Sequence, residues 1–279
     1  MLAFLKARWR VLGGAAVCAF AGLGGVAAAK HKGTITPVTE SHASATLLAR
    51  AMTHNKHLLL SGRFAAVPPD NRPNAVSTEP LAGFPLRGSR YVILTNGCAA
   101  LADHAKMAGL PGCRDNGIPF RGTRDLTVLR VTLSVPTGAN CLSFRFRFLS
   151  QEYPQFVGNI YNDGFIAELD QTTWNSGANG NVNDPHISAP RDFATDPRGH
   201  IISINATGPA TMTAANARGT SYGGATPVLR ASTPITPGIH SLFLSIFDQG
   251  DRQYDSAVFL DNLTVGKVPG CKSGIAHTQ

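Results

Sequence analysis

The sequence predicts an all-β protein, an antiparallel β-sandwich of jelly-roll type that carries one short N-terminal helix. Short apolar segments with strand periodicity follow one another along most of the chain. The 29 glycines and 18 prolines supply turn residues between these segments. Strand-length and helix-length patterns do not alternate, so the sequence does not indicate a parallel α/β sheet.

The clearest strand patterns lie in the middle of the chain. Segment 126–136 alternates Leu and Val with Arg, Thr and Ser, which is typical of a strand with one buried face. Segment 142–148 places three phenylalanines on one face and Arg145 and Arg147 on the other. That arginine face is expected to be solvated, with contact to an acidic polymer as the alternative. Further strands are expected at 89–97, 165–169, 200–205, 240–247 and 257–265.

One helix is predicted at 41–53, before the first clear strand. Ser41 or Ser44 is its expected N-cap, and Leu47, Leu48, Ala51 and Met52 share one face. Three prolines make 67–74 a loop. Segment 170–199 is rich in Asn, Asp, Gly and Pro, and it is expected either to cover a site or to be a surface insertion.

The N-terminus has the features of a secretory signal peptide, predicted over residues 1–29. Three basic residues precede an apolar run at 11–26, and small residues follow it up to Ala29. An uncleaved anchor and lipidation at Cys18 are the alternatives. The remaining chain is divided into an N-terminal extension (30–80), a sandwich domain (81–268) and a tail (269–279). We expect a secreted or extracellular protein, including one held at the cell surface, with no membrane segment after cleavage.

Cleavage would leave four cysteines and a modest positive charge. The formal net charge of the whole chain is +8, and loss of three basic residues with the signal leaves about +5. This charge is spread along the chain, so nucleic-acid binding is not expected. Four cysteines in an exported protein predict two disulfides, with three possible connectivities. The favoured pairs are Cys98–Cys113, which closes a short excursion, and Cys141–Cys271, which joins the start of one strand to the end of the last.

Acidic residues gather in two stretches, 150–163 and 248–262. Turns that follow different strands can meet at one end of a sandwich, and Ca²⁺ prefers six to eight oxygen ligands. The sequence therefore predicts one calcium site. Neither stretch contains Cys or His, which argues against zinc or copper. The predicted ligands are Glu152, Asn162, Asp163, Asp248, Asp251, Asp255 and Asp261.

Two alternatives exist for these acids. Asp and Asn in turns commonly bond their own backbone, so the cluster could be a metal-free capping network. Two carboxylates could instead flank a glycosidic bond and hydrolyse it. Tyr153 and Tyr161 lie beside the acids and are candidates for stacking on sugar rings, with a place in the core as the alternative.

The two acidic stretches also carry a family resemblance. FRFLSQEYPQFVGNIYNDGF and FDQGDRQYDSAVFLDNLTV resemble the choice-of-anchor L family of exported bacterial domains. The resemblance is strong over 142–169 and 240–265, fainter over 85–103 and poor over 170–235. It implies a fold and a location rather than a chemistry, because the family has no well-defined activity. No downstream anchor is expected from this sequence, which is a departure from the pattern that the family's name describes.

Together these observations predict a calcium-stabilised extracellular binding or adhesion module. Its expected partner is a glycan or a cell-wall polymer. The alternatives are a secreted carbohydrate-active hydrolase that uses the Glu/Asp cluster, and a purely structural component of an extracellular matrix.

Overall fold

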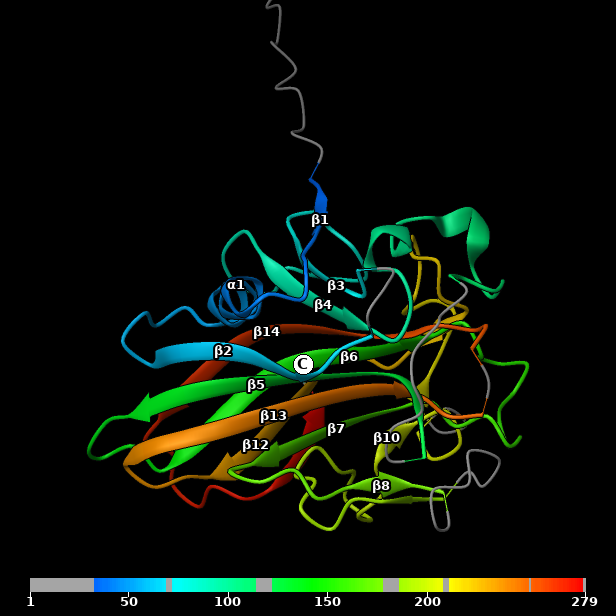
Figure 1. Ribbon diagram of the computed structural model, residues 1–279. Coiled ribbons are helices and arrows are strands. Elements are labelled where there is room, and N and C mark those ends of the chain that lie inside the picture. Colours follow the sequence, from blue (N-terminus) through cyan, green and yellow to red (C-terminus); the bar gives the residue numbers. More distant parts are fainter. Residues whose placement is uncertain are drawn as a thin grey trace, which may run out of the picture. The chain divides into compact units, whose positions relative to one another are not determined.

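Two antiparallel sheets pack face to face in the computed structural model (Figure 1). It describes residues 33–68, 72–113, 122–177, 186–207, 211–250 and 252–277. The predicted signal peptide, 1–29, lies outside these ranges. No helix in the described ranges is long and apolar enough to cross a membrane.

The first sheet contains most of the described strands. Its order is β1-β3-β4-β14-β6-β12-β15, and β11 also pairs with β6. Their bounds are β1 Ile35–Pro37, β3 Asn74–Ser77, β4 Tyr91–Thr95, β6 Cys141–Ser150, β11 Gly224–Ala225, β12 Leu229–Pro234, β14 Ser256–Gly266 and β15 Gly274–His277.

The second sheet has the order β10-β7-β13-β5-β2. Its strands are β2 Leu59–Ala66, β5 Arg124–Val135, β7 Gly164–Leu169, β10 Ile202–Ser203 and β13 Gly238–Asp248. A separate two-stranded pair joins β8 Asn175–Ser176 to β9 Ile187–Ser188. Two short 3₁₀ helices, η1 Ala99–Leu101 and η2 Ala105–Met107, follow β4.

The pairing of the strands is that of a jelly roll, which confirms the predicted fold. Strand β4 pairs with β14, β5 with β13, β6 with β12, and β7 with β10. The chain is thus a long hairpin folded over so that successive strands alternate between the sheets. The sheets extend beyond the predicted 81–268 domain, because β1, β2, β3 and β15 also pair within them.

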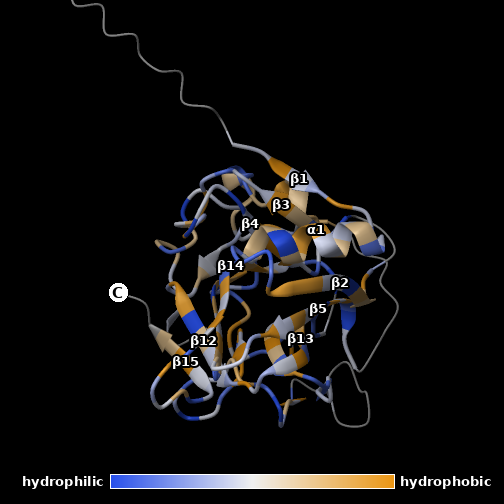
Figure 2. Ribbon diagram, turned by 90° about the vertical axis from the view of Figure 1, so that its left-hand side faces the viewer, coloured by the Kyte–Doolittle hydropathy of each residue, from blue (hydrophilic) through white to orange (hydrophobic). Residues whose placement is uncertain are grey.

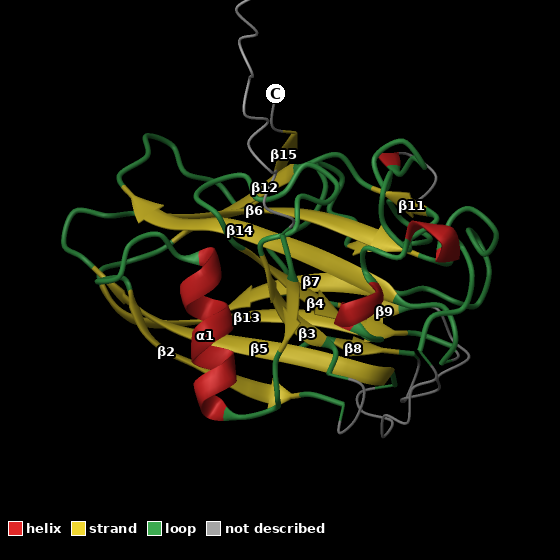
Figure 3. Cartoon of the chain, turned by 90° about the horizontal axis from the view of Figure 1, so that it is seen from above, coloured by secondary structure: helices red, strands yellow, loops and turns green. Residues whose placement is uncertain are grey.

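The main core lies between the sheets. Phe144, Phe146 and Phe148 are fully buried there, as the alternation of β6 predicts. Helix α1, His42–Met52, closes the side of the sandwich along β2 (Figure 3), and it carries both hydrophobic and hydrophilic residues (Figure 2). Ser41 caps this helix by accepting a hydrogen bond from the Ser44 N–H, which confirms one of the two predicted caps.

Close packing of α1 depends on a glycine in β2. A Cβ at Gly62 would overlap the backbone of Ala45. The Gly62 N–H instead donates to Thr46 Oγ1 at 3.1 Å, and that hydroxyl donates to the Gly62 carbonyl at 3.2 Å. Only a residue without a side chain lets the helix and the strand come this near.

A second apolar cluster covers part of the outer face of the first sheet. Phe84, Tyr91 and Phe259 pack ring against ring there, with centroids 5.3–5.8 Å apart. Arg147 lies on the same face and donates to the carbonyls of Ala82 and Asn216, each at 2.7 Å. The expectation of a solvated arginine face is therefore wrong for Arg147, because two loops bury it and lower the pKa of its guanidinium.

The described part of the 170–199 segment is packed on the second sheet. Trp174 stacks on Phe247 with ring centroids 4.6 Å apart, and its indole N–H donates to Ser245 Oγ at 3.0 Å. Phe193 reaches the main core. These contacts make the described part of this segment a cover for the second sheet.

Candidate functional site

The two ends of the sandwich carry the groups of interest. At the end that we call the acidic end, β6 and β13 finish and β7 and β14 begin. At the opposite end, β12 turns into β13 and β6 begins. Each end holds one disulfide: Cys98–Cys113 at the acidic end and Cys141–Cys271 at the other. Both predicted pairings are confirmed, each with Cα atoms 5.7 Å apart.

Asp163 is the centre of the acidic end. Its side chain is fully buried. One carboxylate oxygen accepts from the Asn96 amide at 2.8 Å, and the other accepts from the Gln249 N–H at 2.9 Å. Asn96 also accepts from the Ser256 N–H at 2.7 Å. Asp163 thereby connects the start of β7 to the residues that follow β4 and β13, and Asn96 extends this connection to the start of β14.

Asp255 fixes the first disulfide to this end. Its carboxylate accepts from the Cys113 N–H at 3.1 Å. A Cβ at Gly97 or at Gly112 would overlap this carboxylate. The two glycines therefore leave the space into which Asp255 fits. Gln151 pairs with the Asp255 backbone through both its own N–H and its side-chain oxygen, at 2.9 and 3.0 Å.

The remaining predicted ligands are not all found at the acidic end. Glu152, Asn162 and Asp248 are buried at the acidic end. Asn162 accepts from the Asn205 N–H at 3.0 Å, and Asp248 lies opposite Arg124 in the strand register. Asp251 lies outside the described residues.

Asp261 does not lie with the others. It is five residues into β14 from Ser256, which at about 3.3 Å per residue places it about 16 Å from the acidic end. Its carboxylate accepts from the N–H groups of Leu86 at 2.7 Å and Arg87 at 2.9 Å, and it contacts His54 Nε2 at 3.1 Å. A bulge at this point of β14 frees the side chain to bind the 84–88 loop.

The two tyrosines lie in aromatic and glycine contacts near the acidic end. The Tyr153 ring is half-buried over Gly224, where a Cβ would overlap it. The Tyr161 ring meets Phe156 edge to face at 5.3 Å, and Phe156 meets Tyr254 at 4.8 Å. The predicted stacking of either ring on a sugar stays a prediction.

The donor atoms around the acids determine what the cluster can do. N–H groups point at the carboxylates of Asp163 and Asp255, an arrangement that stabilises a buried negative charge without an ion. No group of three or more His, Cys, Asp or Glu within the described ranges could hold a metal ion. Calcium binding stays a prediction. The hydrogen bonds that Asp163 and Asp255 accept are those expected of the alternative, a metal-free capping network.

A basic pocket, which the sequence analysis missed, lies beside the end of α1. Its volume is about 520 Å³. It is lined by Arg50, His54, Lys56 and Arg90 together with polar groups from Asn55 and Ser89, and no acidic residue is in its lining. The cations come from two segments that are some 35 residues apart in the chain. Only the packing of α1 against the 88–90 loop brings them together, so no local motif could have indicated the pocket.

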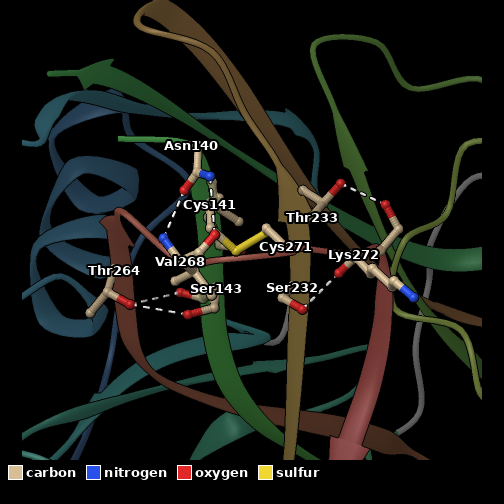
Figure 4. Close-up of a disulfide and its surroundings, with 11 residues drawn as sticks. Asn140, Cys141, Ser143, Ser232, Thr233, Thr264, Val268, Cys271 and Lys272 are labelled. Atoms are coloured by element: carbon tan, nitrogen blue, oxygen red, sulfur yellow. Dashed lines mark hydrogen bonds between the residues drawn. A yellow bond between two sulfur atoms is a disulfide. The ribbon is translucent and has the colours of Figure 1, made fainter. Parts of the chain in front are cut away.

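The opposite end is closed by the second disulfide (Figure 4). Cys141 at the start of β6 reaches Cys271 after β14, and Asn140 exchanges two hydrogen bonds with the Val268 backbone at 2.8 and 3.0 Å. Ser232 donates to the Lys272 carbonyl at 2.9 Å. The residues after β14 are thus fixed across the ends of β6 and β12.

Comparison with known protein families gives a match. A search of curated proteins found no match. The profile of the family described as Choice-of-anchor L domain matches residues 115–265, which is more than half of the chain and includes both acidic stretches. That description suggests an exported module associated with the cell surface. The chain therefore belongs to the choice-of-anchor L family.

Proposed function

We propose that the protein is an extracellular or cell-surface binding module whose ligand is a glycan or cell-wall polymer bearing anionic groups. The basic pocket is the observation that carries this proposal. It is a concave site in which several cations converge without an acidic residue in the lining. A site of that kind favours carboxylate or phosphate groups over neutral sugars.

The cations of the pocket are available for a ligand. Within the described part of the chain, no salt bridge involves Arg50, Lys56 or Arg90. All three side chains are exposed. The nearby carboxylate of Asp261 is fully buried and is already bound by His54 and three backbone N–H groups. A bound anion would thus meet positive charge that the fold does not neutralise.

The neighbouring sheet face extends this positive charge. Arg145 on β6 lies directly opposite Arg230 on β12, and like charges in that position repel each other. Neither has a salt bridge among the described residues, although Asp261 lies opposite Arg145 on its other side. Arg87, in the loop that leads into the pocket, contacts Asn262 at 3.4 Å. A polymer with repeated anionic groups could contact this face and the pocket together.

Binding of defined polymers tests the proposal. Polygalacturonate and poly(glycerol phosphate) supply carboxylate and phosphate groups, and dextran is the neutral control. We expect both anionic polymers to bind, more weakly as salt rises, and dextran not to bind. Arg50→Ala with Arg90→Ala should weaken binding at least about tenfold.

The matched control has the same change in charge elsewhere. Arg191 and Arg198 are exposed and lie outside the pocket. Arg191→Ala with Arg198→Ala should leave affinity within about twofold, since only screened long-range charge is lost. Equal losses in the two double variants, or equal binding of dextran, would show that the pocket is not the site.

Calcium at the acidic end is a separate proposal. Its support is the burial of several carboxylates at one end of the sandwich, where a cation would offset their repulsion. The polymer proposal does not depend on it, so polymer binding is measured both in calcium and in EDTA. A calcium requirement would link the acidic end to the basic pocket, and equal binding in calcium and in EDTA would show that the two sites are independent.

A further inference from the structure

The end opposite the acidic end holds a threonine, a histidine and an aspartate in one hydrogen-bonded line. His240 Nδ1 lies 2.9 and 3.1 Å from the two carboxylate oxygens of Asp170. His240 Nε2 lies 3.3 Å from the Thr236 hydroxyl. This is the order of groups in a hydrolase that activates a hydroxyl nucleophile: nucleophile, base, and a carboxylate that orients the base.

The fold fixes each member separately. His240 lies near the start of β13, and its side chain is only 14% exposed. Asp170 directly follows β7, and its carboxylate also accepts from the Ser241 N–H at 3.0 Å. Thr236 lies in the connection from β12 to β13 and is exposed. The aspartate and the histidine are thus held on neighbouring strands, and the hydroxyl faces solvent.

The proton positions follow from the chemistry of the carboxylate. An ionised carboxylate can only accept, so Asp170 selects the tautomer of His240 that carries its proton on Nδ1. The lone pair on Nε2 then faces the Thr236 hydroxyl. In this tautomer the histidine can take the hydroxyl proton.

An open pocket lies over these groups. Its volume is about 580 Å³, and Asp170, Thr236 and His240 are all in its lining. Leu169 and Ile235 contribute apolar surface, and the Cys141–Cys271 disulfide region forms another wall. The pocket has room for a small acyl group beside the hydroxyl.

We propose that Thr236, His240 and Asp170 form a site that hydrolyses acyl esters. The Thr236 oxygen attacks the ester carbonyl carbon while its proton passes to His240 Nε2. The bond from the carbonyl carbon to the alkoxy oxygen breaks, and the released alcohol takes the proton from the histidine. Water then attacks the acyl-threonine with the histidine again as base, which releases a carboxylic acid and restores the hydroxyl. This activity is independent of polymer binding at the basic pocket.

Ester hydrolysis and covalent labelling of the mature protein test the site. The substrate is p-nitrophenyl acetate, and the label is a fluorophosphonate, which is located by peptide mass spectrometry. We expect hydrolysis above the rate in buffer and a label on Thr236. Thr236→Val keeps the shape but removes the hydroxyl, so it should abolish the label and lower the rate at least about 100-fold, since activation by a base contributes about 10²–10⁴.

Other variants separate catalysis from structure. Thr236→Ser restores a hydroxyl and should restore both signals, and Asp170→Asn should lower the rate while the label still appears more slowly. His200→Gln is the matched control. His200 Nδ1 lies 3.1 Å from a carboxylate oxygen of Asp196, so the two residues form a similar pair, and this pair lies outside the pocket. This variant should change neither signal. Melting temperatures show which variants remain folded.

Two results would overturn the proposal. One is a wild-type rate equal to that of folded Thr236→Val. The other is the absence of label on Thr236 in the folded wild-type protein. Denatured protein is the unreactive reference for this measurement. If the arginine variants lose polymer binding but keep ester hydrolysis, the hydrolytic site is independent of the basic pocket. If the wild-type protein binds polymer but does not hydrolyse esters, only the proposed binding function is supported.

Discussion

The two ends of the sandwich use carboxylates in opposite ways. At the acidic end Asp163 and Asp255 are buried, and N–H groups bind them. At the other end the Asp170 side chain is 45% exposed and faces a histidine ring. A buried carboxylate with fixed donors holds chain segments together, whereas an exposed one beside a titratable base remains open to chemistry.

This difference shows why clustering in the sequence is a poor guide to a site. The acidic stretches attract notice because their carboxylates are close in the chain. The Asp170, Thr236 and His240 group is spread over about 70 residues, and no motif marks it. The two ends should therefore respond differently to the same kind of substitution.

The largest expected effect comes from the disulfides. Cys141–Cys271 closes a loop with a sequence separation of 130, and Cys98–Cys113 one of 15. Each disulfide restricts the unfolded chain, more so for the longer loop. Replacement of both cysteines by alanine should therefore lower the free energy of unfolding by about 5 kcal/mol for Cys141–Cys271 and by about 3 kcal/mol for Cys98–Cys113. Urea unfolding of the two double variants measures this. An equal or reversed order would mean that local packing at the acidic end outweighs the loop length.

The next effect compares a buried with an exposed carboxylate. Asp163→Ala leaves the Asn96 amide and the Gln249 N–H without their acceptor in a buried site. We expect a loss of about 2–4 kcal/mol in the free energy of unfolding. Asp170→Ala should cost less than about 1 kcal/mol, because water reaches that site. Chemical denaturation of both variants at one pH makes the comparison, and similar losses would contradict it.

A third carboxylate, Asp192, is an intermediate case. One of its oxygens accepts from the N–H groups of Ala167 and Ala194, at 3.0 and 2.9 Å. The other oxygen is buried without a partner among the described residues. Burial raises the pKa of Asp192 to about 7, against the two hydrogen bonds that lower it. The folded state thus favours the protonated side chain.

The sign of the pH effect follows from that shift. Between about pH 4 and 7 the unfolded chain ionises Asp192 while the folded protein keeps the proton, so the contribution of Asp192 to stability falls as pH rises, by at most about 1.4 kcal/mol per pH unit. Asp192→Asn should flatten this decline. Unfolding of both proteins at pH 5, 6 and 7 provides the measurement, and parallel curves would assign the decline to other groups.

The smallest expected effect is that of calcium. Extracellular modules bind the ion at about 10⁻⁴ to 10⁻³ M, so millimolar calcium would raise the melting temperature by only a few degrees. The calcium proposal predicts that Asp163→Ala removes most of this rise. Asp163→Ala should still lower the stability in EDTA, because the hydrogen bonds from Asn96 and Gln249 to Asp163 need no ion. If the wild-type melting temperature is the same in EDTA and in 10 mM calcium, and no heat of binding is measured, the acidic end is a capping network that does not bind calcium.

Much of the fold could be predicted because it depends on local patterns. The alternation in β6 placed Phe144, Phe146 and Phe148 in the core, and serine caps marked the helix start. Strands β2, β3 and β12 were missed, since glycine, polar residues and short length weaken their alternation. Their position was decided by pairing with strands distant in the chain, which no local pattern encodes.

The jelly-roll class and the family could be predicted from the sequence, because periodicity and motif are properties of the chain. Cysteine spacing favoured the two disulfide pairs among three possible connectivities, and the structure contains those two. Only the tertiary structure decided which polar groups meet. The position of Asp261 five residues along β14, next to a bulge, placed its carboxylate at His54 and the 84–88 loop rather than at the acidic end. Packing of α1 assembled the basic pocket, and the pairing of β7 with β13 brought Asp170 to His240. Such contacts depend on register and packing between segments far apart in the chain, and a shift of one residue would reverse the face of every side chain involved.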